Sequence, residues 1–288
     1  MKKTVSVKSL LIIVFALIGL FVVLGVGGYV FLIHEPEEEY ALSIVKYGSD
    51  MDEIVLKQEE TNLETFIPHE KDLNLCIYLS GQCKGCVEFL EEFSKIRDVL
   101  GENTISYSFI FTSSLPRNIE EYGVDKEMCY RPLDNILLAT STPTFFLINQ
   151  DGIVEFTTIE FDLMLEKIVG FEGFDIEEAK SNATEYILEK YCSDETNKKK
   201  LVYFAMKGCP DCEEADKVIE STEIVSVYDV TKIYAWNFSE ANYICDNYNL
   251  FQHIYELNWY PSFLIWKDGL PQILGEMSNQ ELRERLLQ

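Results

Sequence analysis

Residues 201–221, LVYFAMKGCPDCEEADKVIES, join an apolar run to two cysteines that are separated by two residues. The apolar run follows three lysines and is typical of a buried strand. The residues from Cys209 onward are typical of a helix that begins at the cysteines. The stretch therefore predicts that Cys209 and Cys212 lie where a strand runs into the N-terminus of a helix.

An earlier stretch, LNLCIYLSGQCKGCVEFLEEFSKIRDVL at residues 73–100, has the same organisation. Residues 73–80 predict a buried strand. Apolar residues then recur at spacings of three and four, which is typical of an amphipathic helix; they are Val87, Leu90, Phe93, Ile96 and Leu100. Cys83 and Cys86 thus occupy the same position in this stretch as the later cysteine pair does in its own.

Further elements follow each cysteine pair in the same order: a strand, a proline, a hairpin and a helix. The second strand of the second unit is expected at residues 223–230, EIVSVYDV, and the two hairpins turn at Asp151-Gly152 and at Asp268-Gly269. Such self-similarity indicates a duplicated fold. We expect an α/β chain with one domain at residues 61–174 and another at 175–288.

Residues 10–33 contain no side chain that is charged at neutral pH and are long enough to cross a bilayer as a helix. Lysines precede this stretch and acidic residues follow it, so the N-terminus is expected in the cytoplasm. The alternative is a cleaved signal peptide, but its hydrophobic region is usually shorter. We therefore expect residues 1–33 to form a cytoplasmic stub and a transmembrane anchor, with residues 34–60 as a polar linker that leads into the first domain with a short helical pattern around Leu63.

From residue 34 onward the chain carries 21 basic and 49 acidic residues, a net charge of −28. Such a surface repels phosphate backbones, so nucleic acid is not an expected partner. Solubility is the simplest reason for the charge. The predicted orientation puts the domains outside the cytoplasm, in an oxidising environment, and a bacterial cell surface or periplasm is favoured.

The two cysteine pairs raise two alternatives, a shared zinc site or two redox centres. Zinc sites built from two such pairs usually have 15–20 residues between them, whereas 122 residues separate Cys86 from Cys209. A thiolate at a helix N-terminus is stabilised by free N–H groups and by the helix dipole. Cys83 and Cys209 are therefore the candidate nucleophiles, with Cys86 and Cys212 as resolving thiols, and no bound metal is expected.

The prolines strengthen this interpretation. Pro143 in TSTPTFF and Pro261 in NWYPSFL each stand just before the first strand of a hairpin. With these residues the chain resembles two tandem domains of the thioredoxin superfamily, over about residues 60–170 and 176–288. TPTFFLINQDG is similar to membrane-anchored thiol reductases of cytochrome maturation, and YPSFLIWKDG is closer to thioredoxin and protein disulfide isomerase.

The resemblance implies a central mixed sheet flanked by helices, with cis-prolines that face the cysteine pairs. It also implies that Thr142-Pro143 and Tyr260-Pro261 bind an extended substrate. The chain departs from the family at Gln82 and Gly208, where many thioredoxins have tryptophan, and neither strand before the cysteines carries the family's buried acid.

These observations predict a membrane-anchored, extracytoplasmic thiol-disulfide oxidoreductase that exchanges disulfides with exported proteins or peptides. The resemblance implies a membrane electron donor or acceptor and no bound cofactor; the direction of electron flow stays open. Lys84 is expected to favour the Cys83 thiolate and Asp211 to disfavour that of Cys209. The alternative function is a redox-inactive surface scaffold or binding module whose cysteine pairs are structural disulfides.

Four cysteines lie outside the two pairs: Cys76, Cys129, Cys192 and Cys245. Buried small side chains or structural bridges are the simplest interpretation, and a further redox relay is the alternative. Four cysteines allow three pairings, and the sequence does not choose among them.

Overall fold

The computed structural model describes residues 40–46, 53–59, 62–65, 71–112, 115–132, 139, 141–150, 154–193, 197–235 and 243–288. The expected span at residues 10–33 and the expected turn at Asp151-Gly152 lie outside these ranges. Within them, no helix combines the length and the apolar character needed to cross a membrane.

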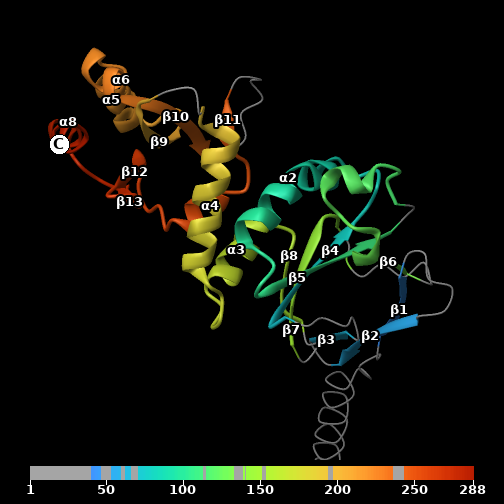
Figure 1. Cartoon of the computed structure of the whole chain (residues 1–288). Helices are drawn as coiled ribbons and strands as arrows, with labels where there is room; N and C mark the ends of the chain where they lie inside the picture. Colours follow the sequence, from blue (N-terminus) through green and yellow to red (C-terminus); the bar gives the residue numbers. More distant parts are fainter. Residues whose placement is uncertain are drawn as a thin grey trace, which may run out of the picture.

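The first sheet has its described strands in the order β3-β2-β1-β6-β5-β4-β7-β8 (Figure 1). They are β1 (Tyr40–Lys46), β2 (Glu53–Glu59), β3 (Asn62–Thr65), β4 (Leu73–Leu79), β5 (Ile105–Phe111), β6 (Cys129–Pro132), β7 (Thr144–Asn149) and β8 (Val154–Thr158). Helices α2 (Lys84–Leu100) and α3 (Phe161–Val169) and the 3-10 turns η1 (Ile119–Tyr122) and η2 (Lys126–Met128) belong to this unit. β4 lies between β5 and β7, and all its residues are buried, which explains its continuous apolar run.

Residues 34–60 differ from the expected polar linker. β1 and β2 lie in this stretch and extend the first sheet beyond β6 as antiparallel strands. Leu63 lies in β3 and not in the helical pattern that its apolar neighbours suggested. Pairing with a neighbouring strand, rather than side-chain periodicity, determines the structure here.

The second sheet has its described strands in the order β11-β10-β9-β12-β13. They are β9 (Lys199–Met206), β10 (Tyr228–Ala235), β11 (Ile244–Asp246), β12 (Ser262–Lys267) and β13 (Leu270–Leu274). The helices of this unit are α4 (Ile176–Tyr191), α5 (Pro210–Ile219), α6 (Thr222–Val227), α7 (Leu250–Ile254) and α8 (Asn279–Leu287). Residues 223–227, expected as a strand, belong to α6, and the strand begins only at Tyr228.

The two sheets repeat one topology. The order β6-β5-β4-β7-β8 in the first corresponds to β11-β10-β9-β12-β13 in the second. Within each of these five-strand orders the first three strands run parallel to one another and the last two run antiparallel to their neighbours. The second hairpin turns at Asp268-Gly269, where both residues have positive φ angles, as a two-residue turn of this kind requires. The internal repeat in the sequence is therefore a repeat in the structure.

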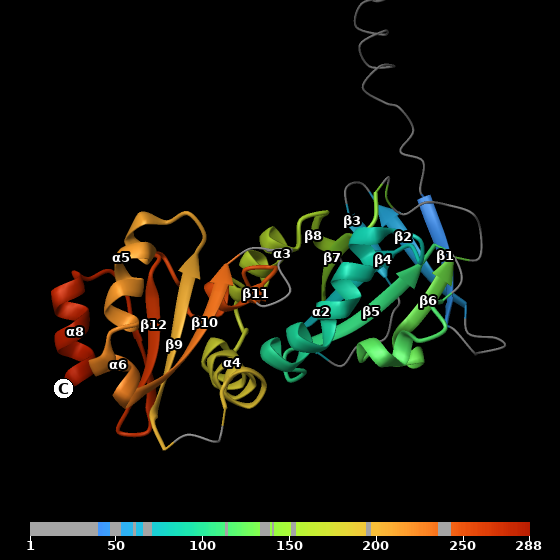
Figure 2. The ribbon, with the colours of Figure 1, turned by 90° about the horizontal axis from the view of Figure 1, so that it is seen from above.

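Helices cover both faces of the second sheet. Alternate residues of β9 point to opposite sides: Leu201 and Tyr203 pack in a core with α5 and α8, whereas Val202 and Phe204 pack with α4 and α7. Figure 2 shows α4 between the second sheet and helix α2 of the first unit. The helices α4 and α7 therefore separate the second sheet from the first unit.

A single hydrophobic core runs across the boundary between the units. It contains Phe93 of α2, Phe161 of α3, Ala183 of α4 and Phe251 of α7 together with residues of both sheets. Polar contacts cross the same boundary: Asn247 donates to Glu92 at 3.0 Å, Asn249 donates to Asp162 at 3.1 Å, and His253 lies 2.9 Å from Asp162. The two units are thus packed together through their interiors as well as joined by the chain.

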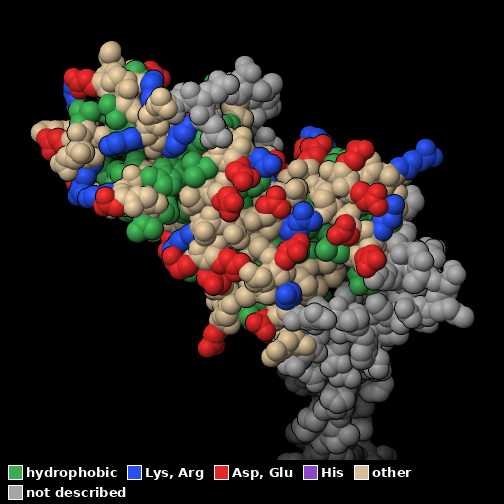
Figure 3. All heavy atoms as spheres, in the orientation of Figure 1, with side chains coloured by type: hydrophobic (Ala, Val, Ile, Leu, Met, Phe, Trp, Pro, Cys, Tyr) green, Lys and Arg blue, Asp and Glu red, His purple; other side chains and the backbone are tan. Residues whose placement is uncertain are grey.

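Acidic side chains are spread over the face of both units that Figure 3 shows, as the net charge leads one to expect. On the same face, hydrophobic side chains gather between the hairpin β12–β13 and helix α4. Leu270, at the tip of that hairpin, is 71% exposed. The surface is therefore acidic but not uniformly polar.

Candidate active sites

The first cysteine pair lies at the N-terminus of α2. Cys83 is the N-cap residue, and its sulfur accepts a hydrogen bond from the backbone N–H of Cys86 at 3.3 Å. The Cys83 thiol donates to the carbonyl oxygen of Thr142 at 3.1 Å, and the Thr142-Pro143 peptide bond is cis. Cys83 is partly exposed, whereas Cys86 is buried. The arrangement offers one accessible sulfur and one sheltered sulfur.

The two thiols of this pair differ in acidity. Burial works against ionisation of Cys83, but hydrogen bonds from the Cys86 thiol, from the Thr142 side chain and from the N–H groups of Cys86 and Gly85 outweigh it. They hold the pKa of Cys83 below that of an ordinary thiol. Burial, followed by the interaction with Cys83, raises the pKa of Cys86 to about 11. Near neutral pH the proton therefore leaves Cys83 first.

Lys84 contributes less to this acidity than its sequence position suggests. Its ammonium group lies 3.2 Å from Glu88, and the Lys84 side chain is 90% exposed. Water and the neighbouring carboxylate screen its charge from the sulfur. Hydrogen-bond donors, and not Lys84, lower the pKa of Cys83.

The second cysteine pair has the same backbone arrangement at the N-terminus of α5. Cys209 is the N-cap residue and accepts from the N–H of Cys212 at 3.1 Å. The Cys209 sulfur lies 3.6 Å from the carbonyl oxygen of Tyr260, and the Tyr260-Pro261 bond is also cis. Burial raises the pKa of Cys212 to about 12. Both sulfurs are buried here, so Cys209 is less accessible than Cys83.

The structure brings the eight candidate residues together in two clusters. Cys83, Cys86 and Thr142-Pro143 form the first centre, and the equivalent residues of α5 and Tyr260-Pro261 form the second. Their roles in exchange stay predictions. Within the described part of the chain, no group of three or more His, Cys, Asp or Glu side chains is arranged to hold a metal ion.

No protein-family model and no curated protein matches the sequence. Both units have a thioredoxin-like fold. The strand order, the cysteines at a helix N-terminus and the facing proline carry this assignment in each unit.

Solved structures with similarity to the chain include a secreted Mycobacterium tuberculosis disulfide oxidoreductase homologous to E. coli DsbE, which is 20% identical over 31% of this chain and 80% of that chain, with a TM-score of 0.26. StoA from Bacillus subtilis is 16% identical over 43% of this chain and 90% of its own, with a TM-score of 0.28. The alkylhydroperoxide reductase protein AhpF of Enterococcus faecalis is 18% identical over 75% of this chain and 91% of its own, with a TM-score of 0.21.

Nothing in the sequence indicates that the second thioredoxin-like unit contributes to the first centre. Tyr248, which precedes α7, packs edge-on against Phe89 of α2 and Phe161 of α3, with ring centroids 5.9 and 5.4 Å apart. Phe89 lies one helical turn after Cys86. Packing between units leaves no periodic signal in the sequence, so only the structure identifies Tyr248.

A groove with a volume of about 660 Å³ lies beside the second centre. The proline loop with Trp259, the start of α5 and the segment between β13 and α8 form its walls. Asp211 lies in the wall, between the two cysteines of the pair. The groove therefore lies along the loop whose carbonyl group contacts the Cys209 sulfur.

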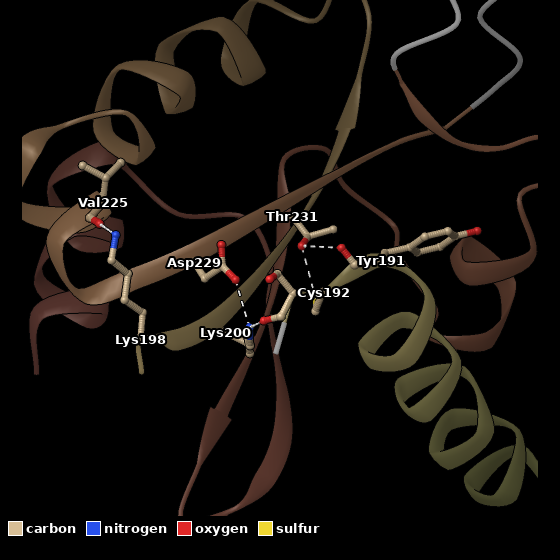
Figure 4. A network of polar contacts seen from close by, with 8 residues as sticks. Tyr191, Cys192, Lys198, Lys200, Val225, Asp229 and Thr231 are labelled. Atoms are coloured by element: carbon tan, nitrogen blue, oxygen red, sulfur yellow. Dashed lines mark hydrogen bonds and ion pairs between the residues drawn. The ribbon is translucent and has the colours of Figure 1, made fainter. Parts of the chain in front are cut away.

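The remaining cysteines do not join either centre, and the eight cysteines, all of which lie in the described part of the chain, form no disulfide with one another. Burial raises the pKa of both Cys76 and Cys129 to about 12. Cys76 packs on the face of the first sheet opposite to Cys86. The Cys192 sulfur lies 3.4 Å from the hydroxyl of Thr231 on β10, beside the ion pair of Lys200 with Asp229 (Figure 4). The buried thiols thus fit the interpretation as packing residues.

Proposed function

We propose that the protein is a thiol-disulfide oxidoreductase that exchanges disulfides with exported proteins or peptides through its two cysteine pairs. Residues 10–33 would anchor it, with both thioredoxin-like units outside the cytoplasm. The observation that carries the proposal is the difference in exposure and acidity between the two thiols of the first centre. The accessible Cys83 has a lowered pKa, and the buried Cys86 behind it has a raised one.

The chemistry begins with the Cys83 thiolate. It attacks one sulfur of a substrate disulfide, a mixed disulfide forms, and the other substrate sulfur leaves as a thiolate. Cys86 then loses its proton and attacks the Cys83 sulfur. The Cys83–Cys86 disulfide forms, the second substrate thiolate leaves, and two electrons have passed from the pair to the substrate. The reverse sequence oxidises a substrate dithiol.

The raised pKa of Cys86 fits this order of events. The negative charge of Cys83 is one cause of that raised pKa. Formation of the mixed disulfide removes this charge, so the pKa of Cys86 falls when its thiolate is needed. Before that step Cys86 stays protonated and does not compete for substrate.

Substrate docking is proposed at the loop before each proline. The carbonyl oxygens of Thr142 and Tyr260 lie within hydrogen-bond distance of the nucleophilic sulfurs. A substrate in extended conformation would pair with the backbone of these residues and hold its own sulfur beside the cysteine. A membrane electron donor or acceptor would reset each pair after exchange.

Trapping of the mixed disulfide tests the proposal. Full-length protein with Cys209→Ser and Cys212→Ser keeps only the first centre. Adding Cys86→Ser to this double variant removes the thiol that would attack the mixed disulfide at Cys83. We expect this triple variant to accumulate a mixed disulfide with oxidised glutathione, detected by mass spectrometry, while the double variant releases it. Cys192→Ser in place of Cys86→Ser is the matched control and should not trap. If no variant captures glutathione and the pairs prove more reducing than about −300 mV, they are structural disulfides and exchange is not the function.

A further inference from the structure

We propose that the second centre acts on cysteine-containing peptide segments that carry lysine or arginine next to the cysteine. The inference rests on the proposed function and adds the substrate class of one of its two centres. Its basis is the chemical character of the groove beside Cys209, which differs from that of the corresponding surface at the first centre.

Acidic side chains dominate the charge of the groove. Among the described residues, its lining includes Asp211, Glu214 and Glu276 and no lysine, arginine or histidine. Lys217 pairs with Glu214, so one of the three charges is compensated. Asp211 and Glu276 are exposed and have no ion-pair partner within the described residues. The groove therefore presents two unpaired carboxylates to whatever enters it.

The position of the groove makes these charges relevant to exchange. Asp211 lies between Cys209 and Cys212, and Tyr260 and Pro261 belong to the wall. The carbonyl oxygen of Tyr260 contacts the Cys209 sulfur. A substrate that places its sulfur against Cys209 and follows the loop at Tyr260 and Pro261 therefore has its neighbouring residues along the groove.

Trp259 adds a feature that suits a cationic side chain. It lines the groove immediately before Tyr260 and is 57% exposed. An exposed indole ring attracts the ammonium group of lysine or the guanidinium group of arginine that lies over its face. Carboxylates and an exposed indole together favour a positively charged and partly apolar side chain.

The first centre shares only part of these features at equivalent places. Gly85 stands in place of Asp211 and Ser141 in place of Trp259, whereas the exposed Glu160 follows β8 at the place of Glu276. Glu88, the equivalent of Glu214, pairs with Lys84. The first centre thus has one carboxylate fewer and a serine in place of the indole ring, so its preference for a basic substrate should be weaker.

The test uses two synthetic peptides that each carry one cysteine, flanked by two lysines in one and by two glutamates in the other. Each cysteine is linked to thionitrobenzoate, whose release is followed by absorbance. Cys209 attacks the peptide sulfur, thionitrobenzoate leaves as a thiolate, and Cys212 then releases the peptide thiol. Dithiothreitol returns the pair to the dithiol. Full-length protein with Cys83→Ser and Cys86→Ser reports the second centre alone, and Cys209→Ser with Cys212→Ser reports the first.

The rate with the lysine peptide is divided by the rate with the glutamate peptide, and this ratio is then divided by the ratio that dithiothreitol alone gives for the same peptides. We expect this corrected ratio to be about ten at the second centre. The corrected ratio should be nearer to one at the first centre. It should also fall toward one at the second centre in about 1 M salt, where exposed charges are screened beyond about 3 Å.

Two variants connect the preference to the groove. Glu276→Gln should lower the corrected ratio several-fold, and Trp259→Ala should slow the lysine peptide more than the glutamate peptide. Glu220→Gln is the matched control, because Glu220 is exposed at the opposite end of α5 and does not line the groove. It should leave the ratio unchanged.

The outcomes separate the two proposals. If the second centre exchanges with both peptides and its corrected ratio is one, or if Glu276→Gln does not change the ratio, the basic preference is overturned and the proposed function stands. Binding of the lysine peptide with serine in place of cysteine, measured by tryptophan fluorescence, without exchange of either cysteine peptide, supports the preference and overturns the redox function. Failure to bind or exchange overturns both.

Discussion

At the scale of single residues, the two sulfurs of the first centre show how position alone divides chemical roles. Both belong to cysteines of one four-residue motif, yet Cys83 stands at the open end of a helix and Cys86 in the core beneath it. Free N–H groups stabilise a thiolate at the first position, and burial disfavours one at the second. Hydrogen bonds and burial, and not the charge of Lys84, thus determine which of the two thiols has the lower pKa.

This leads to a prediction for the acidity of Cys83. In the reduced protein, alkylation of Cys83 by iodoacetamide should show a pH midpoint below that of a free cysteine, about 8.5, while Cys86 with its pKa of about 11 reacts slowly at pH 8. Cys86→Ala removes a hydrogen-bond donor to the thiolate and should raise the midpoint. Cys86→Ser keeps a donor and should raise it less. Mass spectrometry of labelled peptides measures each site, and an equal midpoint in both variants would contradict the role of this hydrogen bond.

At the scale of elements, the helices that position the centres depend on particular caps. Asp246 is buried before α7, and its carboxylate accepts from the N–H groups of Leu250 at 2.9 Å and Phe251 at 2.8 Å. Asp246→Ala leaves two buried N–H groups without partners and should cost about 2–4 kcal/mol of unfolding free energy. Ser278→Ala, at the cap of the exposed helix α8, should cost only about 1 kcal/mol. Urea denaturation of both variants measures the difference.

The same carboxylate predicts a pH dependence. Burial raises the pKa of Asp246, against the opposing effects of Lys95 and of backbone N–H groups. The folded protein therefore binds this proton more tightly than the unfolded chain does. Its contribution to stability is present at low pH and is lost as the pH rises from about 3.9 through the raised folded pKa. In Asp246→Asn this loss should be absent, which urea titrations between pH 4 and 7 would show; an equal loss in both proteins would contradict it.

The elements also show what the sequence can predict. The spacing of apolar residues after Cys86 and the Asp268-Gly269 turn identify α2 and the second hairpin correctly, because both are local signals. Residues 223–227 are rich in β-branched side chains and suggest a strand, yet they form α6, which lies against α8 and β10. β1 pairs with β2 and with β6, and the pairing with β6 is a contact between distant residues that leaves no local pattern.

The same contrast between local signals and tertiary contacts holds for the candidate centres. Both cysteine pairs and both prolines are recognisable from spacing and order, so the eight candidate residues could be named in advance. Tyr248 beside the first centre and Glu276 beside the second could not, since each reaches its place through tertiary packing. Asp211 and Trp259 are visible in the sequence, but the groove that they share with Glu276 is not.

At the scale of the whole molecule, helix α4 connects the two units. It follows the first unit in the chain, packs on α2 and faces the second sheet. Its buried face uses small residues, Ala179 and Ala183, which allow close approach on both sides. The helix therefore belongs to both cores, and its packing should control the stability of the whole chain.

Overpacking of α4 tests this role. Ala183→Leu inserts a larger side chain into a fully buried position and should cost about 1–3 kcal/mol. Ser181→Leu, on the exposed face of the same helix, is the control and should cost little. Hydrogen exchange should show weaker protection in both α2 and β9 of Ala183→Leu. Loss of protection in β9 alone would mean that the units have separate cores.

The continuous core has a consequence for how the protein meets its partners. Rotation of one unit against the other would open an interior that contains aromatic rings from both, at a cost of many buried contacts. The two cysteine pairs therefore keep a fixed separation and orientation relative to each other. In the proposed exchange reaction, a substrate released from one centre would therefore not be carried to the other by a domain movement. It would have to dissociate and bind again, so each centre could select its own substrate.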